Sequence, residues 1–103
     1  MDKNASNKRK SIRRLHNIKI LFHCDNFQYL GTVTNCSETG MCIKTTHYIS
    51  CDDNIGIIIP LEEEIINLSG RVIRIAKGDN IYRNIGVELL NPPPKYSAYL
   101  ENL

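Results

Sequence analysis

The chain has 103 residues, of which 42% are hydrophobic and 23% are charged, a composition typical of one soluble globular domain. A chain of this length can bury a modest core without disulfides or a structural metal. Its apolar run over residues 15–22 is short and interrupted by polar residues, which excludes a secretory signal and a membrane-spanning helix. We therefore expect a cytoplasmic protein with no membrane insertion.

Charge is unevenly distributed along the chain. Residues 1–19 carry seven Lys or Arg against one acidic residue, whereas the remainder carries six basic and ten acidic residues. The first dozen residues also lack any apolar periodicity, so we expect residues 1–16 to form a flexible basic arm and residues 17–103 to form the folded domain. A basic arm on a mildly acidic body favours a small anion over a long nucleic acid.

Alternating apolar and polar residues predict β-strands, with order beginning near Asn17. The expected strands cover about residues 18–25, 28–34, 41–45, 55–59, 63–76 and 81–89. The fifth is either one bent strand or two short ones with a bulge or kink at Gly70, and Asn84 is a possible second bulge. Six short strands joined by tight turns indicate an all-β fold, either an antiparallel barrel or a sandwich.

A short helix is expected after the prolines at 92–94. Four apolar side chains follow at the spacing of one helical face. They are Tyr96, Tyr99, Leu100 and Leu103. So short a helix is not stable alone and must dock on an open end of its own barrel or on a partner subunit, which leaves a homodimer possible.

A polar corner separates the second and third predicted strands. Asn35 and Ser37 have side chains that can bond to nearby backbone, and Gly40 can adopt a positive φ without a steric clash. This Asn x Ser x x Gly pattern is well suited to a tight connection between strands. Taken alone, it predicts a turn and no function.

A second motif lies upstream, where Arg9 and Arg13 form Arg x x x Arg about twenty residues before the corner. The segments 70–75 (GRVIRI) and 85–89 (IGVEL) follow later in the chain. In order and spacing, these four elements resemble the PilZ domain family, which are bacterial receptors for the second messenger cyclic di-GMP. The resemblance covers about residues 8–100 and implies a single-domain, six-stranded antiparallel β-barrel with a short C-terminal α-helix.

The basic run and the resemblance together give the candidate ligand-binding residues. These are Lys8, Arg9, Arg13, Arg14, Asn35, Ser37 and Gly40. Arginine suits the ligand because its planar fork can pair with guanine O6 and N7, with phosphate, or with the face of a base. The resemblance implies that Asn35 and Ser37 bond to guanine or phosphate and that Gly40 lets the nucleotide approach.

Lys8 stands where many relatives carry a third arginine. A lysine there keeps the charge but loses the stacking surface, so one bound nucleotide and an intercalated pair both remain open. In either case we expect the ligand to fold the arm onto the barrel.

Catalysis and metal binding have little support in the sequence. No Ser, His and Asp order, no paired carboxylates and no Gly-rich phosphate loop appear, so we expect neither an enzyme nor a cofactor. The cysteines Cys24, Cys36, Cys42 and Cys51 include no Cys x x Cys pair. A zinc site could be drawn only by adding His23 and His47, and reduced thiols packed as small hydrophobic groups, with solvated histidines, are the favoured reading.

The predicted function is that of a cytoplasmic cyclic di-GMP receptor that signals through an unidentified effector protein. One alternative is a PilZ-like adaptor without nucleotide binding, although an adaptor needs none of the Arg and Asn x Ser x x Gly residues. Another is a small barrel that binds single-stranded nucleic acid. Against it, the aromatic residues are not interleaved with a basic strand face in the sequence. They are Phe22, Phe27, Tyr29, Tyr48 and Tyr82.

Overall fold

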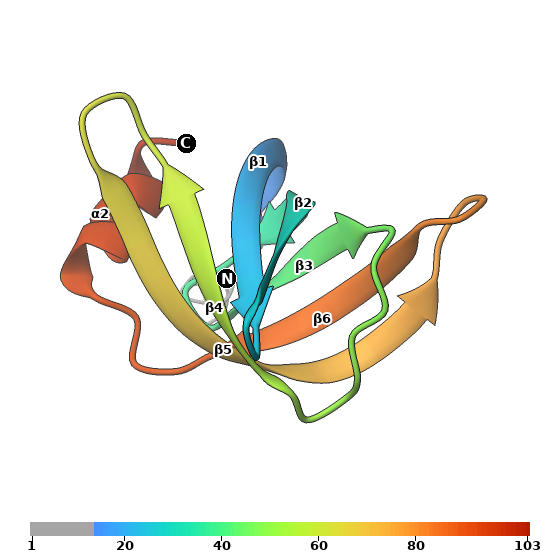
Figure 1. Ribbon diagram of the computed structural model, residues 1–103. Helices are drawn as coiled ribbons and strands as arrows, with labels where there is room; N and C mark the ends of the chain where they lie inside the picture. Colours follow the sequence, from blue (N-terminus) through green and yellow to red (C-terminus); the bar gives the residue numbers. More distant parts are fainter. Residues whose placement is uncertain (1–13) are drawn as a thin grey trace, which may run out of the picture.

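The computed structural model describes the backbone of residues 14–103 and side chains from residue 17 onward. Its strands are β1 (Arg14–Cys24), β2 (Phe27–Cys36), β3 (Gly40–Thr45), β4 (Asn54–Pro60), β5 (Ile65–Lys77) and β6 (Arg83–Leu89), followed by helix α2 (Pro94–Glu101). All neighbouring strands are antiparallel, and they close into a barrel in the order β1-β2-β3-β6-β5-β4 (Figure 1). The expected six-stranded barrel and C-terminal helix are confirmed, with a first strand that begins at Arg14, before the expected start near Asn17.

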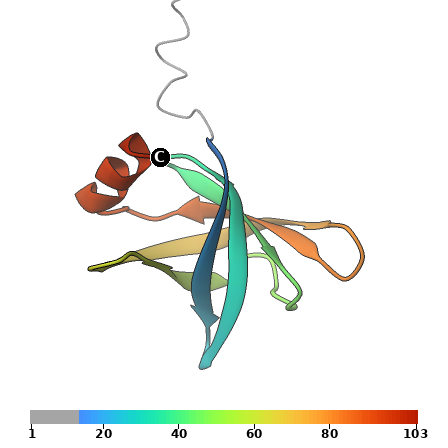
Figure 2. The ribbon, with the colours of Figure 1, turned by 90° about the horizontal axis from the view of Figure 1, so that it is seen from above.

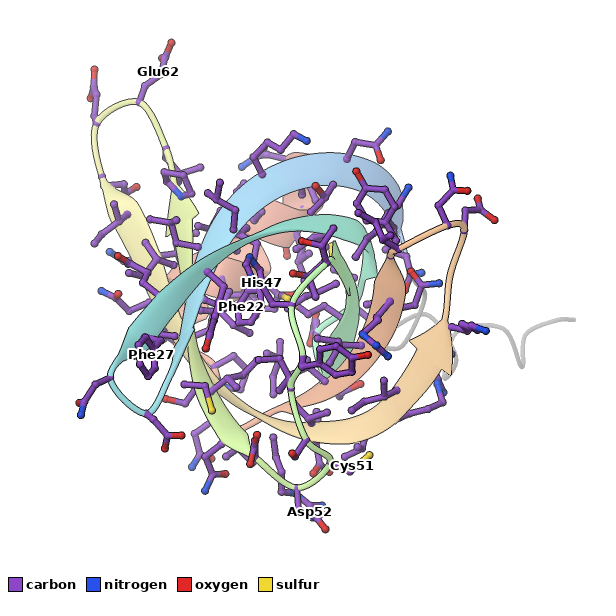
Figure 3. All side chains as sticks on the ribbon, turned by 45° about the vertical axis from the view of Figure 1, so that its right-hand side comes forward. Phe22, Phe27, His47, Cys51, Asp52 and Glu62 are labelled. Carbon is purple, nitrogen blue, oxygen red and sulfur yellow. The ribbon has the colours of Figure 1, made fainter. Side chains whose placement is uncertain are left out.

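The core follows from the period-two pattern of the strands. In β4, for example, Ile55, Ile57 and Ile59 are buried, while the residues between them are only partly buried. Phe22 is fully buried inside the barrel (Figure 3). Gly31 makes room for it, because a Cβ at position 31 would lie 3.0 Å from the Phe22 ring. The alternation that is visible in the sequence therefore becomes a filled barrel interior.

The strand register shifts at three places, and these differ from the predicted bulges. The shifts lie between Leu15 and Ile18 in β1, between Val33 and Asn35 in β2, and between Val72 and Arg74 in β5. Each of the last two leaves one extra residue on one strand, as a β-bulge does.

The bulges predicted at Gly70 and Asn84 are therefore wrong. Gly70 pairs regularly with Ile55 and Leu89, and Asn84 pairs regularly with Lys44 and Ala76. Gly70 is needed for packing instead, because a Cβ there would overlap the side chain of Val87.

Helix α2 docks on its own barrel, one of the two placements expected from the sequence. Tyr96 and Leu100 are buried in the barrel core, and Tyr99 is half-buried. The helix lies beside the β4–β5 hairpin (Figure 1), where Lys95 Nζ is 3.2 Å from the Glu64 carboxylate. The placement of Leu103 in the buried stripe was wrong, because the helix ends at Glu101 and Leu103 is exposed.

The two hairpins on either side of β5 extend in different directions from the barrel. Figure 2 shows α2 on one side and the β5–β6 hairpin on the opposite side. Glu62 marks the tip of the β4–β5 hairpin, away from the barrel interior (Figure 3). Within residues 14–103, no helix has both the length and the apolar character required to span a membrane.

Candidate functional site

The polar corner between β2 and β3 is held by the backbone and side chain of Ser37. Its N–H donates to the carbonyl of Gly40 at 2.8 Å, which closes a tight turn. The Ser37 hydroxyl is buried, accepts a hydrogen bond from the Thr39 N–H at 3.3 Å and donates to the Gly40 carbonyl at 3.4 Å. These are long bonds, so each contributes modestly, but together they support a role for Ser37 in shaping the corner.

Two distant segments also fix the corner. The Tyr96 hydroxyl of α2 donates to the Ser37 carbonyl at 2.7 Å, and the Leu89 N–H at the end of β6 donates to the Thr39 carbonyl at 2.9 Å. Tyr96 was not among the residues predicted for this region. The sequence did contain one indication of this contact. A buried tyrosine needs a partner for its hydroxyl, and the polar corner offers carbonyl groups.

The expectation of a positive φ at Gly40 is wrong. No glycine in the described part of the chain has a positive φ, and Gly40 begins β3 in a regular pair with Glu88. The corner therefore turns without a left-handed residue at this position. A role for Gly40 in admitting the nucleotide stays a prediction that rests on the lack of a side chain.

The bulge in β2 determines which way Asn35 faces. Val33 is buried in the core, and strict alternation along the strand would place Asn35 on the same inner side. The register shift instead sets Asn35 opposite Cys42, which lies between two core residues of β3 and so faces outward. Asn35 is half-buried on this outer face. The bulge thus places Asn35, the first residue of the Asn x Ser x x Gly motif, on the surface beside the corner.

The basic segment joins the barrel at the same place. In the register of β1 and β2, Arg14 pairs with Cys36 and Leu15 pairs with Asn35. The predicted ligand residues Lys8, Arg9 and Arg13 lie outside the described residues, and Arg14 is described in its backbone only. The two motifs, separated by about twenty residues in sequence, are therefore connected through adjacent strands.

Comparison with known proteins identifies the family of this chain. The sequence profile of the PilZ domain matches residues 7–103. This chain belongs to the PilZ domain family. PilZ domains are receptor and adaptor domains rather than enzymes, and cyclic di-GMP is the ligand of the family.

A solved structure with the same fold is that of the Bacillus subtilis Inhibitor of motility (MotI/DgrA). It is 17% identical in sequence, superimposes with a TM-score of 0.71, and is matched over 86% of this chain and 46% of that chain. This PilZ domain therefore spans about half the length of that protein, and the likeness shows a shared fold. Comparison with curated proteins gives no match.

Metal-binding groups are not clustered in the described part of this PilZ domain. Within residues 17–103, no three or more His, Cys, Asp or Glu side chains are grouped to hold a metal ion. Cys36 is buried in the core as a small hydrophobic group, whereas Cys51 is exposed. His47 is not simply solvated, since its ring lies 4.6 Å from the ring of Tyr29.

Lys19, Leu30, Lys44 and Tyr82 contribute to an open groove of about 450 Å³. The Lys44 ammonium is 4.5 Å from the centre of the Tyr82 ring, and the Arg83 guanidinium is 3.6 Å from that of Tyr48. The structure thus brings basic and aromatic side chains together in this groove and, for Arg83 and Tyr48, in a second pocket, which the sequence did not predict. Each cation lies over one face of its ring, and Tyr48 remains 82% exposed.

Proposed function

We propose that this PilZ domain is a cytoplasmic receptor for cyclic di-GMP, which binds between the basic N-terminal segment and the corner at residues 35–40. The observation that supports it best is the pairing of Arg14 with Cys36 and of Leu15 with Asn35. It joins the Arg x x x Arg segment to the barrel directly beside the Asn x Ser x x Gly segment. An adaptor that does not bind nucleotide would need the pairing of β1 with β2, but not the Arg and Asn x Ser x x Gly residues that this pairing joins.

The chemistry of the ligand suits the residues of the two segments. Arg9 and Arg13 supply guanidinium forks for guanine O6 and N7 and for phosphate, while Lys8 and Arg14 add positive charge. Asn35, on the outer face, offers amide donors and an acceptor. Ser37 shapes the corner with its buried hydroxyl, and its direct bond to the ligand stays a prediction.

Signalling follows from ordering of the basic segment on the ligand. A segment that is free in one state and fixed in the other gives a partner two surfaces to distinguish. Because the ligand binds both the segment and the barrel, it favours the fixed state. We propose that an effector protein, as yet unidentified, reads this difference.

Calorimetric titration of the full chain tests the proposal with cyclic di-GMP, cyclic di-AMP, GTP and a short single-stranded oligonucleotide. Cyclic di-GMP should bind far more tightly than cyclic di-AMP, because the adenine N6 amine would face an arginine donor. Equal affinities would contradict guanine recognition. Oligonucleotide binding without a cyclic di-GMP response would favour the nucleic-acid reading, and no binding of any of these would favour the adaptor.

Substitutions in the basic segment test which of its residues contact the ligand. Arg9→Ala or Arg13→Ala should each remove a ligand contact of roughly 1 to 3 kcal/mol, by analogy with arginine contacts to bases in DNA. A loss of this size lowers the affinity about 5-fold to 150-fold. Arg13→Lys should rescue only partly, because the fork is lost. Lys77→Ala, which removes an exposed charge from the end of β5, should change affinity by less than about twofold and serves as the matched control.

A further inference from the structure

A row of four residues crosses the outer face of the barrel from the corner. Asn35 of β2 pairs with Cys42 of β3, Cys42 with Gly86 of β6, and Gly86 with Arg74 of β5. Neighbouring strands are about 4.8 Å apart, so the row extends over roughly 14 Å. Its two middle residues are small, and its two ends carry an amide and a guanidinium. The row therefore forms a low floor between two polar ends, with Cys42 partly exposed and Gly86 buried.

Arg74 faces outward because of the bulge in β5. Val72 is fully buried in the core, so strict alternation would place Arg74 inside the barrel as well. The register shift between these two residues turns Arg74 to the exposed side. The bulge in β2 does the same for Asn35. Bulges commonly re-aim side chains beside functional sites, and here two of them serve one surface.

The side chain of Arg74 reaches over β6. A Cβ added at Gly86 would lie 3.3 Å from Nη2 and 3.4 Å from Cζ of Arg74, so the guanidinium contacts the bare backbone of Gly86. This position directs the cation across the sheet, from β5 over the strand that borders β3. The lack of a side chain at Gly86 allows the guanidinium to lie low on the floor.

Arg74 also differs from Arg71, the other arginine of this strand. Arg71 is neutralised by Glu88 Oε1 at 3.0 Å and Asp52 Oδ1 at 3.3 Å. Arg74 makes no ion pair with any carboxylate of residues 17–103. Its five N–H donors are therefore available to an anion or a carbonyl acceptor from outside the barrel. Together, the two residues provide a matched comparison on one strand.

From this geometry we infer that Arg74 is a further ligand-binding residue, which pairs with the O6 and N7 acceptors of the guanine that the basic segment does not hold. The inference rests on the proposed function, since it assigns the far side of the same cyclic di-GMP site. The ligand lies over Cys42, with Asn35 on one side and Arg74, whose guanidinium covers Gly86, on the other. Arg74 thus supplies a contact that neither sequence motif contains.

Calorimetric titration of the full chain with cyclic di-GMP tests the inference with Arg74→Gln and Arg71→Gln. Glutamine keeps part of the aliphatic stem and removes the charge and the fork. Arg74→Gln should lower affinity at least about fivefold, the equivalent of one base contact, and Arg71→Gln by less than about twofold. Urea denaturation midpoints equal to that of the wild type would show that the loss is not one of folding.

A second variant acts on the same guanidinium without removing it. Gly86→Ala should raise Arg74 from the floor and lower affinity in the wild-type background, but should have little further effect when combined with Arg74→Gln. Equal affinities of Arg74→Gln and Arg71→Gln, with a wild type that binds, would overturn this inference alone. A wild type that does not bind cyclic di-GMP would overturn the proposed function, and the role of Arg74 with it.

Discussion

Tyr96 is the residue through which the C-terminal helix holds the corner. Its buried hydroxyl donates to the Ser37 carbonyl at 2.7 Å. Tyr96→Phe keeps the ring and leaves that buried carbonyl without this donor, which should lower the free energy of unfolding by about 1 to 3 kcal/mol in urea denaturation. Cyclic di-GMP affinity should also fall, because the corner loses a point of attachment.

Tyr99→Phe is the matched control for Tyr96→Phe. Tyr99 lies on the same helix, is half-buried, and makes no hydrogen bond to a described residue through its hydroxyl. Its substitution should change the free energy of unfolding by no more than about 0.5 kcal/mol at neutral pH. Similar losses for the two variants would mean that the bond to Ser37 does not hold the corner.

The ionisation of Tyr99 should make the stability of the domain depend on pH. Burial, with a smaller contribution from Cys36, raises the pKa of Tyr99 above its ordinary value of 10.0. The pKa of Tyr99 is therefore higher in the folded than in the unfolded protein. The protonated Tyr99 hydroxyl stabilises the fold fully at pH values below the unfolded-state pKa, and this stabilisation is lost as pH rises through the folded-state pKa. Denaturation of the wild type should therefore show stability falling above about pH 10, and less steeply in Tyr99→Phe. Parallel curves for the two proteins would contradict this assignment.

Helix α2 covers part of the barrel core with one buried face. Leu100 is 5% exposed, whereas Leu103 is 37% exposed and lies beyond the helix end. Leu100→Ala should cost about 2 to 5 kcal/mol of unfolding free energy, because it leaves a cavity in the core. Leu103→Ala should stay within about 0.5 kcal/mol. Equal losses in urea denaturation would mean that the helix does not pack on the barrel as described.

The strands and the helix were predictable because their signals are local. In β4, the alternation of isoleucines indicates one buried face before any partner strand is known. Bulges are different, because a register shift depends on which strand lies alongside. Gly70 looked like a bulge in the sequence but pairs regularly, whereas the shift falls between Val72 and Arg74. Only the pairing with β6 reveals it.

The polar corner was predictable in position but less so in detail, and its role as a ligand site stays a prediction. The connection between β2 and β3 does fall at this segment, with Asn35 near the end of β2, Ser37 in the connection and Gly40 at the start of β3. The sequence could not show that Ser37 has a buried hydroxyl, because burial depends on α2 and β6 closing over the corner. Nor could it show Arg74 on the same face, because the alternation in β5 alone places that residue inside.

The barrel and the basic segment have charges of opposite sign, and they meet at the corner. Residues 1–19 are strongly basic, whereas the remainder is net acidic. An anionic ligand at the junction would neutralise the cationic side chains of the segment and could hold them against the barrel. The segment, the corner and the outer face near Arg74 then act as one binding surface. On this account, the β1–β2 hairpin at the opposite end of β2 takes no part.

Amide hydrogen exchange of the full chain, measured with and without saturating cyclic di-GMP, is the most direct test of a binding surface formed by the basic segment and the corner. We predict slower exchange at residues 5–16 and 35–42 with cyclic di-GMP, no change in the β1–β2 hairpin at residues 24–28, and no effect of cyclic di-AMP at the same concentration. Unchanged exchange at residues 5–16 and 35–42 under saturating cyclic di-GMP would contradict a site formed by the basic segment and the corner, even if the nucleotide binds elsewhere.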